Sequence, residues 1–170
     1  MGSLAGLAPV SEGYATLPVA EAFNWIQATT DLGTGSWYLV AFRSVRQAGA
    51  DEERLALYDE FAHQEAAGCP GFVHYFKGPA GADGSCLSFC LWNTREDARI
   101  AAAKPAHARA VSLIGEMYAS YELEFLQVTR TAEGRLAFEP YGHHEVQPSR
   151  GARPAPRTSP SYSIEPSAAS

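Results

Sequence analysis

The chain has 170 residues, of which 46% are hydrophobic and 19% are charged, and its formal net charge at pH 7 is -6. This length and composition suit one globular domain with additional ends, and the negative charge argues against a nucleic-acid partner, because phosphate binding needs a basic face. No apolar run is long enough to span a bilayer, so no membrane partner is expected. The N-terminal stretch MGSLAGLAPV carries no basic residue of the kind that begins a secretory signal. The three cysteines, Cys69, Cys86 and Cys90, have no disulfide or zinc spacing and are expected to be small buried hydrophobes in a reducing cytoplasm.

The two ends of the chain differ in character. Residues 1–35 are expected to form an N-terminal extension with a short helix near residues 20–32, which places Phe23 and Trp25 against the domain. Residues 147–170 are rich in Pro, Ser and Ala and have almost nothing to bury, so this segment is expected to be a disordered tail.

Between the ends, strand and helix patterns alternate in a regular order. The charged segment DEERLALYDEFAHQEAAG opens with acidic residues, which suit a helix N-terminus, and closes at a glycine. The Gly-rich stretch GPAGADGS joins two strands into a hairpin. The expected elements are strand 36–46, helix 51–68, strands 71–78 and 86–92, helix 94–119 with a break near Pro105, strand 121–130 and a short edge strand in 135–141.

This β-α-β-β-α-β order predicts an α+β, ferredoxin-like domain over residues 36–131, with a four-stranded antiparallel sheet, followed by an extended segment, 132–146. The first strand is apolar on both faces, and helices cover only one face of such a sheet. The second face needs another cover, which is either a second copy of the chain in a homodimer or the N-terminal segment of the same chain. The two alternating sets are Tyr38, Val40 and Phe42, and Trp37, Leu39 and Ala41.

Several quoted stretches together resemble a known superfamily. They are the Pro-Gly-led strand CPGFVHYFKG, the strand LSFCLW that ends in tryptophan, and the acidic helix start followed by Pro-x-His in NTREDARIAAAKPAH. Over Trp37–Arg130 the pattern is similar to the antibiotic-biosynthesis monooxygenase-like, dimeric α+β-barrel superfamily. The resemblance implies a pocket between helices and sheet that holds an aromatic or polycyclic ligand or haem. Trp92 and His107 match residues that line such pockets. The first-strand Asn of that pattern is absent here, and Asn93 belongs to a different place in the fold.

His107 is the candidate catalytic residue. It shares one helical stripe with Val111, Ile114 and Tyr118, and a stripe with these apolar members must face the sheet. Pro105 favours a new helical segment, whose N-terminus disfavours a charged imidazole. A neutral, inward imidazole suits proton abstraction. The alternative is a core histidine bonded to a backbone carbonyl, which is about equally compatible with the pattern.

The expected substrate-binding residues come from several elements. His74 alternates with Phe72 and Phe76, so the three are expected on one face, either in the pocket or in a layer facing a dimer partner. Arg43 and Arg46 lie near the end of the first strand, where they can hold an anionic substrate or be paired or solvated. The full set is Trp92, Asn93, His74, Phe42, Arg43, Val111 and Tyr118.

Two functions from different classes fit this pattern. One is a small monooxygenase-like protein that oxidises an aromatic or polycyclic compound with the assistance of His107. No Rossmann or P-loop motif is present, so no nucleotide cofactor is expected, and no metal site is expected either. The other is a non-catalytic dimeric module that binds a small apolar ligand or haem in the same pocket. The missing first-strand Asn favours the second class.

Overall fold

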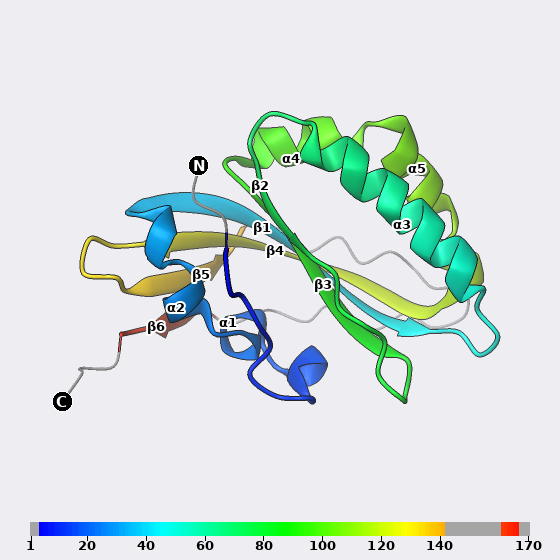
Figure 1. Cartoon of the computed structure of the whole chain (residues 1–170), viewed down its shortest axis with the longest axis horizontal. Helices are drawn as coiled ribbons and strands as arrows, with labels where there is room; N and C mark the ends of the chain where they lie inside the picture. The colour runs from blue at the N-terminus through cyan, green and yellow to red at the C-terminus, as the bar shows by residue number, and fades with distance from the viewer. Residues whose placement is uncertain (1–3, 142–160, 167–170) are drawn as a thin grey trace.

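The computed structural model describes residues 4–141 and 161–166, and its centre is one antiparallel sheet (Figure 1). The strands are β1 (Gly35–Arg46), β2 (Phe72–Phe76), β3 (Ser85–Trp92), β4 (Tyr118–Arg130), β5 (Leu136–Pro140) and β6 (Tyr162–Ile164). Their spatial order is β2-β3-β1-β4-β5-β6. The first four strands have the ferredoxin-like order that the sequence predicts. The predicted four-stranded sheet is too small, because β5 and β6 extend it to six strands.

The last strand corrects the expectation of a wholly disordered C-terminal tail. β6 pairs antiparallel with β5, with Ile164 opposite Leu136 and Tyr162 opposite Phe138. Tyr162 and Ile164 alternate along the strand, so both side chains reach the same core face, where they pack. Two apolar side chains at this spacing are enough to place a short edge strand that the tail's composition hides. Residues 147–160 and 167–170 of the expected tail lie outside the described residues.

One face of the sheet is covered by helices, as predicted (Figure 1). They are α3 (Glu52–Ala67), α4 (Arg95–Ala102), α5 (Pro105–Ser112) and α6 (Ile114–Met117). Asp51 and Thr94 cap α3 and α4 by accepting backbone N–H bonds. The long helix expected over 94–119 is three short ones. Lys104 is extended before Pro105, and Tyr118 already belongs to β4.

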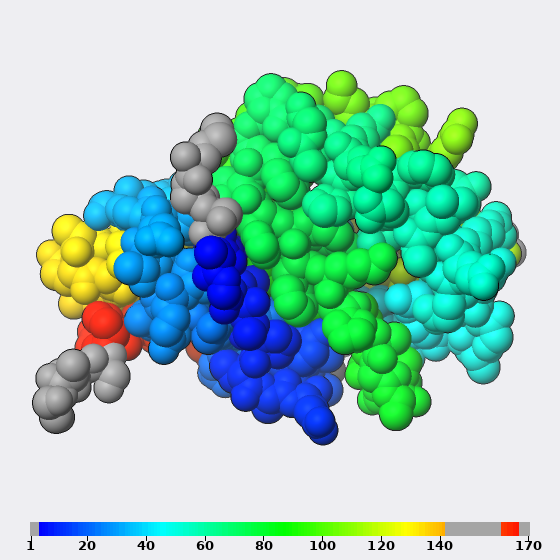
Figure 2. Space-filling view, viewed as in Figure 1, coloured from blue at the N-terminus to red at the C-terminus, as the bar shows by residue number. Residues whose placement is uncertain are grey.

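The chain's own N-terminal segment covers the opposite face of the sheet (Figure 2). Its helical turns are η1 (Tyr14–Thr16), α1 (Val19–Ala22), α2 (Trp25–Ala28) and η2 (Thr30–Leu32), so the single helix expected near residues 20–32 is interrupted. Phe23 has an extended backbone and separates α1 from α2. As predicted, Phe23 and Trp25 pack against the domain, with 3% and 1% of their surface exposed.

This cover removes the reason for a dimer that packs sheet against sheet. Leu39, Phe89 and Phe138 are at most 1% exposed, in one core with Phe23 and Trp25. Of the two covers that the sequence leaves open, the structure has the N-terminal segment. A homodimer remains a prediction, but it would have to use a different surface from this face of β1.

Arg43 fastens the N-terminal segment to the sheet. Its guanidinium forms an ion pair with Glu124 on β4 and donates to the backbone oxygens of Ala15, at 2.7 Å, and Leu17. The side chains of Arg43 and Glu124 are only 19% and 17% exposed. Arg43 therefore lies on the face opposite the helices and acts in folding, which corrects its expected place among the substrate-binding residues.

Candidate active site

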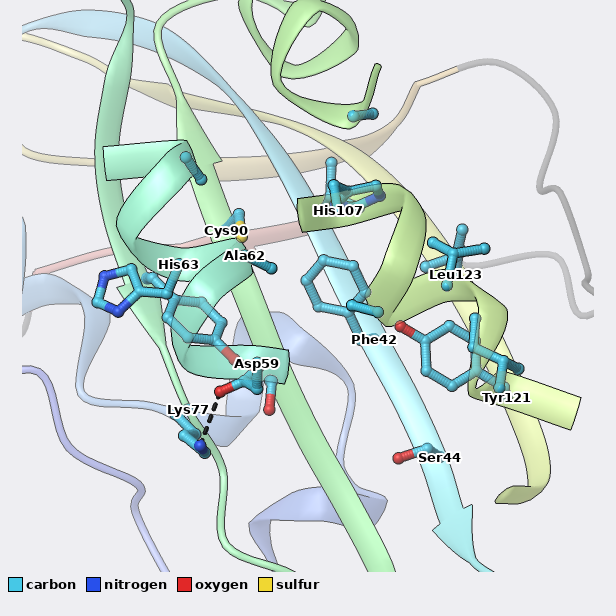
Figure 3. Close-up of a pocket in the computed structure, with 18 of the residues that line it drawn as sticks. Phe42, Ser44, Asp59, Ala62, His63, Lys77, Cys90, His107, Tyr121 and Leu123 are labelled. Atoms are coloured by element: carbon cyan, nitrogen blue, oxygen red, sulfur yellow. Dashed lines mark hydrogen bonds and ion pairs between the residues drawn. The ribbon is translucent and has the colours of Figure 1, made fainter. Parts of the chain in front are cut away.

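A cavity of about 850 Å³ lies between the helices and the sheet (Figure 3). This volume falls in the range of small-molecule sites, roughly 300–1,000 Å³. β1, β3 and β4 form its floor and α3, α4 and α5 its opposite wall. Seven alanines of the helices line the cavity, and their small side chains leave space between the two layers. These are Ala56, Ala62, Ala66, Ala98, Ala101, Ala102 and Ala110.

The strand pattern explains which residues form the floor. Alternate residues of β1 point to the cavity, namely Tyr38, Val40, Phe42, Ser44 and Arg46. The prediction that one alternating set of β1 meets the helices is therefore confirmed. The floor changes character along the strand, from aromatic at Tyr38 to charged at Arg46.

His107 lies at the start of α5 and lines the cavity (Figure 3). The carboxylate of Glu65 on α3 accepts the backbone N–H of Ala106 at 2.9 Å and of His107 at 3.4 Å, which fixes this helix end. Burial lowers the pKa of His107, and the nearby charge of Glu65 opposes that shift. Desolvation is the larger effect, so a neutral imidazole is favoured at pH 7.

The stripe predicted around His107 lines one wall. Val111, Ile114 and Tyr118 all border the cavity with it. Tyr118 reaches the cavity from the first residue of β4 instead of from a helix, because the chain turns into the strand at Met117. The guanidinium carbon of Arg46 lies 5.5 Å from the centre of the Tyr118 ring. The predicted position of this stripe is correct, whereas the catalytic role of His107 stays a prediction.

Trp92 and Phe42 also border the cavity. Trp92 is 3% exposed and packs with Tyr38 and Ala98, and the ring of Phe72 meets it edge-on at 5.4 Å. Trp92 therefore forms the apolar end of the cavity and is also part of a hydrophobic core cluster. Phe42 lies near the middle of the floor.

Asn93 and His74 are outside the cavity, as is Arg43. Asn93 is exposed beyond the end of β3, where its backbone N–H donates to Gly71 at 2.7 Å. The His74 ring faces Phe89, 6.1 Å away, in the core on the opposite side of the sheet. A register shift between Phe72 and His74 separates these two residues, so Phe72 borders the cavity and does not share a face with His74. The sequence does not reveal this bulge.

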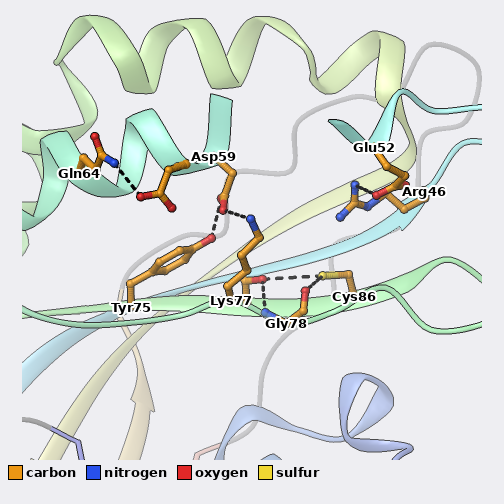
Figure 4. A network of polar contacts seen from close by, with 10 residues as sticks. Arg46, Glu52, Asp59, Gln64, Tyr75, Lys77, Gly78 and Cys86 are labelled. Atoms are coloured by element: carbon orange, nitrogen blue, oxygen red, sulfur yellow. Dashed lines mark hydrogen bonds and ion pairs between the residues drawn. The ribbon is translucent and has the colours of Figure 1, made fainter. Parts of the chain in front are cut away.

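A group of polar side chains in the cavity was missed by the sequence reasoning (Figure 4). Asp59 on α3 accepts a hydrogen bond from the Tyr75 hydroxyl at 2.6 Å and forms an ion pair with Lys77 at 2.7 Å. The spacing of Asp59 and His63 is typical of a solvated helix pair, yet both line the cavity. Tyr75 and Lys77 are two residues apart in the segment 71–78 that is predicted as the second strand. This spacing is the sequence pattern that could have placed both side chains on one face.

Burial keeps three further groups of the cavity neutral, namely the Cys90 thiol and the hydroxyls of Tyr75 and Tyr121. It raises the pKa of the Cys90 thiol to about 12, so this cysteine is a poor nucleophile near neutral pH. Burial also raises the pKa of the Tyr121 hydroxyl, and burial followed by the charge of Asp59 raises that of Tyr75. Both phenols are therefore protonated hydrogen-bond donors. His107 and His63 are the imidazoles that line the cavity, and His107 is the one whose pKa is lowered by burial.

Within residues 4–141 and 161–166, no three side chains of His, Cys, Asp or Glu come together in a group that could hold a metal ion. No helix there combines the length and apolar character that crossing a membrane requires.

The chain belongs to the PB2B2.08-like protein family, whose model matches residues 1–140. The UPF0643 protein PB2B2.08 of Schizosaccharomyces pombe is 29% identical to it over 128 residues, which is 65% of this chain. That alignment spans 58% of the yeast protein, so the chain matches little more than half of this relative. The family match includes the N-terminal segment that covers the sheet.

Solved structures with a similar fold come from bacteria. SnoaB of Streptomyces nogalater, described as a cofactor-independent oxygenase, is 16% identical, with a TM-score of 0.43 over 57% of this chain and 94% of its own. A dimeric ferredoxin-like protein of unknown function from Thermobifida fusca is 14% identical, with a TM-score of 0.44 over 57% and 93%. These are likenesses of fold alone and say nothing of the reaction, so the resemblance to the antibiotic-biosynthesis monooxygenase-like superfamily stays a prediction.

Proposed function

We propose that this protein binds an aromatic or polycyclic small molecule between its helices and sheet and oxidises it with dioxygen, without a nucleotide cofactor. The observation that carries the proposal is a cavity of about 850 Å³ with aromatic residues on its floor and a histidine whose pKa is lowered by burial. A neutral imidazole can accept a proton from an acidic carbon or phenol of a bound ligand.

The proposed reaction has two stages. His107 accepts a proton from a ring carbon whose carbanion is delocalised over the aromatic system. The electron pair of that carbanion then reduces dioxygen. For the test compound anthrone, loss of the two methylene hydrogens and gain of one oxygen atom gives anthraquinone, and the second oxygen atom leaves as water. The protonated hydroxyl of Tyr121 can donate a hydrogen bond to a ligand oxygen that becomes negative in the first stage.

Anthrone tests this chemistry directly. The expected result is formation of anthraquinone and consumption of one dioxygen per anthrone, both faster than in buffer, where anthrone oxidises slowly by itself. The variant His107→Gln should lower the rate by about 10²–10⁴-fold, the usual worth of a general base. His74→Gln is the matched control, because burial also lowers the pKa of His74 but its ring lies on the other side of the sheet. Equal rates for the two variants would contradict the proposal.

The second candidate is a non-catalytic module that binds an apolar ligand or haem. The module is favoured because none of the β1 residues that face the cavity has an amide side chain, whereas the superfamily pattern has an Asn on this strand. His63 and His107 both line the cavity and are the available imidazole ligands for a haem iron. Binding of anthrone without turnover would favour the module, and a Soret band in protein mixed with haemin that shifts in His107→Gln would favour haem.

A further inference from the structure

The cavity is positively charged within an acidic protein. The whole chain has 19 acidic and 13 basic residues. Among the residues that line the cavity this balance is reversed, since four are basic and two are acidic. The basic ones are Arg46, Lys77, Arg95 and Arg99, and the acidic ones are Glu52 and Asp59. A cavity with this excess, walled by protein of lower dielectric constant than water, attracts anions.

The polar groups of the sheet gather at one end of the cavity. Arg46 and Ser44 are successive cavity-facing residues of β1, and Tyr118 and Tyr121 lie opposite them on β4. Ser88 lies across from Phe42 on β3 and is only 8% exposed. The aromatic residues Tyr38 and Trp92 form the other end, about 26 Å away for eight residues of strand at roughly 3.3 Å each. Arg95 and Arg99 belong to α4 on the opposite wall, so this gradient is a property of the sheet floor. A ligand that fits the floor has an apolar body and one polar end.

Arg46 is the cation placed for that polar end (Figure 4). Its side chain is 16% exposed, and its Nη1 forms an ion pair with Glu52 at 2.9 Å. Its Nε atom is buried and has no hydrogen-bond acceptor among the described residues. A buried guanidinium N–H without an acceptor is costly, and a carboxylate that binds side-on supplies acceptors to Nε and Nη2 together. Glu52 is 62% exposed and leaves that edge of Arg46 unused.

We infer that the ligand of this cavity is an aromatic carboxylate, whose acidic group is bound by Arg46 at the Ser44 end while its rings lie over Phe42 and Val40. This inference rests on the proposed function, because it needs the cavity to bind aromatic molecules, and it adds the charge and the orientation of the ligand. It also assigns Arg46 as a specificity-determining residue, a role that Arg43, three residues earlier, cannot fill from the opposite face.

Two fluorescent probes of nearly equal shape test the inference at pH 8. Anthracene-2-carboxylate is an anion, and anthracene-2-carboxamide is neutral. The wild-type protein should bind the carboxylate about ten-fold more tightly, the scale of a charge-assisted hydrogen-bonded pair. In Arg46→Gln the affinity for the carboxylate should fall to that for the carboxamide, whose own affinity should not change.

Arg54→Gln is the matched control. Arg54 also forms an ion pair with a glutamate, Glu116 at 3.0 Å, and lies over a tyrosine ring, but it does not line the cavity. It should keep the full preference for the carboxylate. The second variant, Glu52→Gln, frees Arg46 from its partner and should keep or increase the preference. This variant tests whether Arg46→Gln lowers the affinity for the carboxylate only because Glu52 is left unpaired.

Each outcome decides the matter. Loss of the preference in Arg46→Gln but not in Arg54→Gln or Glu52→Gln supports the inference. Equal binding of both probes by the wild type overturns it and leaves the proposed function standing. A preference that survives in Arg46→Gln overturns the assignment to Arg46. If neither probe binds, the proposed function fails, and the inference fails with it.

Discussion

The ring of Trp25 lies 5.1 Å from the ring of Phe89, centre to centre, on the face of the sheet that the helices leave uncovered. Trp25 belongs to the N-terminal segment and Phe89 to β3, so this contact joins the cover to the sheet. The indole N–H of Trp25 donates to the backbone oxygen of Val19 at 2.7 Å, which satisfies its polar atom inside the core. The N-terminal segment is therefore part of the folded domain.

The first prediction concerns this contact. Trp25→Ala should lower the free energy of unfolding by about 3–5 kcal/mol, because it removes a large buried ring and leaves a cavity. Urea unfolding followed by circular dichroism measures the loss. Removal of residues 1–33 exposes the whole face and should cause self-association, detected by light scattering. A truncated chain that stays monomeric with unchanged stability would show that the segment is not needed as a cover.

Arg43 gives a second prediction about the cover. Arg43→Met should cost about 2–4 kcal/mol of unfolding free energy, because Glu124 and the oxygens of Ala15 and Leu17 lose their donor in a largely buried place. Arg54→Met, which breaks an ion pair whose side chains are 41% and 61% exposed, should cost less than about 1 kcal/mol. Equal losses for the two variants in urea unfolding would contradict the role of Arg43 as a fastener.

A third prediction separates a cavity residue from a core residue. His107→Ala should cost less than about 1 kcal/mol, because its side chain borders space that is already open. Leu39→Ala should cost about 2–5 kcal/mol, because Leu39 is fully buried on the opposite face. The comparison needs only thermal or urea unfolding of both variants. A large loss for His107→Ala would mean that the imidazole is a structural part of the core.

The fourth prediction concerns pH. Burial lowers the pKa of His107 in the folded protein, whereas the unfolded chain titrates near the ordinary value of about 6.5. As pH falls through 6.5, the unfolded state therefore binds more protons, and the free energy of unfolding decreases. His107→Gln removes this contribution, so the variant should gain stability relative to the wild type between pH 7.5 and pH 5. A difference that does not change with pH would contradict a lowered pKa.

The sequence predicts the order of the elements and the two ends of α3 well, because these depend on local patterns. The alternation in β1 predicts two covered faces, and the stripe of His107 and Val111 correctly predicts which side of α5 meets the cavity. The same alternation leaves two alternatives for the cover of the second face, a dimer partner and the N-terminal segment. A strand pattern states that a face is buried but not by which chain.

The expectations that the structure corrects depend on long-range geometry. The bulge after Phe72 changes the face of the residues that follow, and no local signal marks it. Arg43 and Arg46 both lie near the end of β1, and only the parity of the strand decides that Arg46 faces the cavity. The i,i+4 spacing of Asp59 and His63 is typical of a solvated helix pair, whereas the partners of Asp59 come from outside its helix, Tyr75 from β2 and Lys77 from just after it. β6 depends on pairing with β5, which a Pro- and Ser-rich context conceals.

The central claim is that an aromatic ligand binds between the helices and the sheet beside His107. Its most direct test is a nuclear magnetic resonance titration of the labelled protein with anthrone under nitrogen, where no oxidation can occur. We predict shifts of the His107 imidazole and of Phe42 and Tyr121, with little change at Phe138 or Leu136 in the core of the opposite face. Absence of shifts at His107, or shifts confined to the opposite face, would contradict the claim.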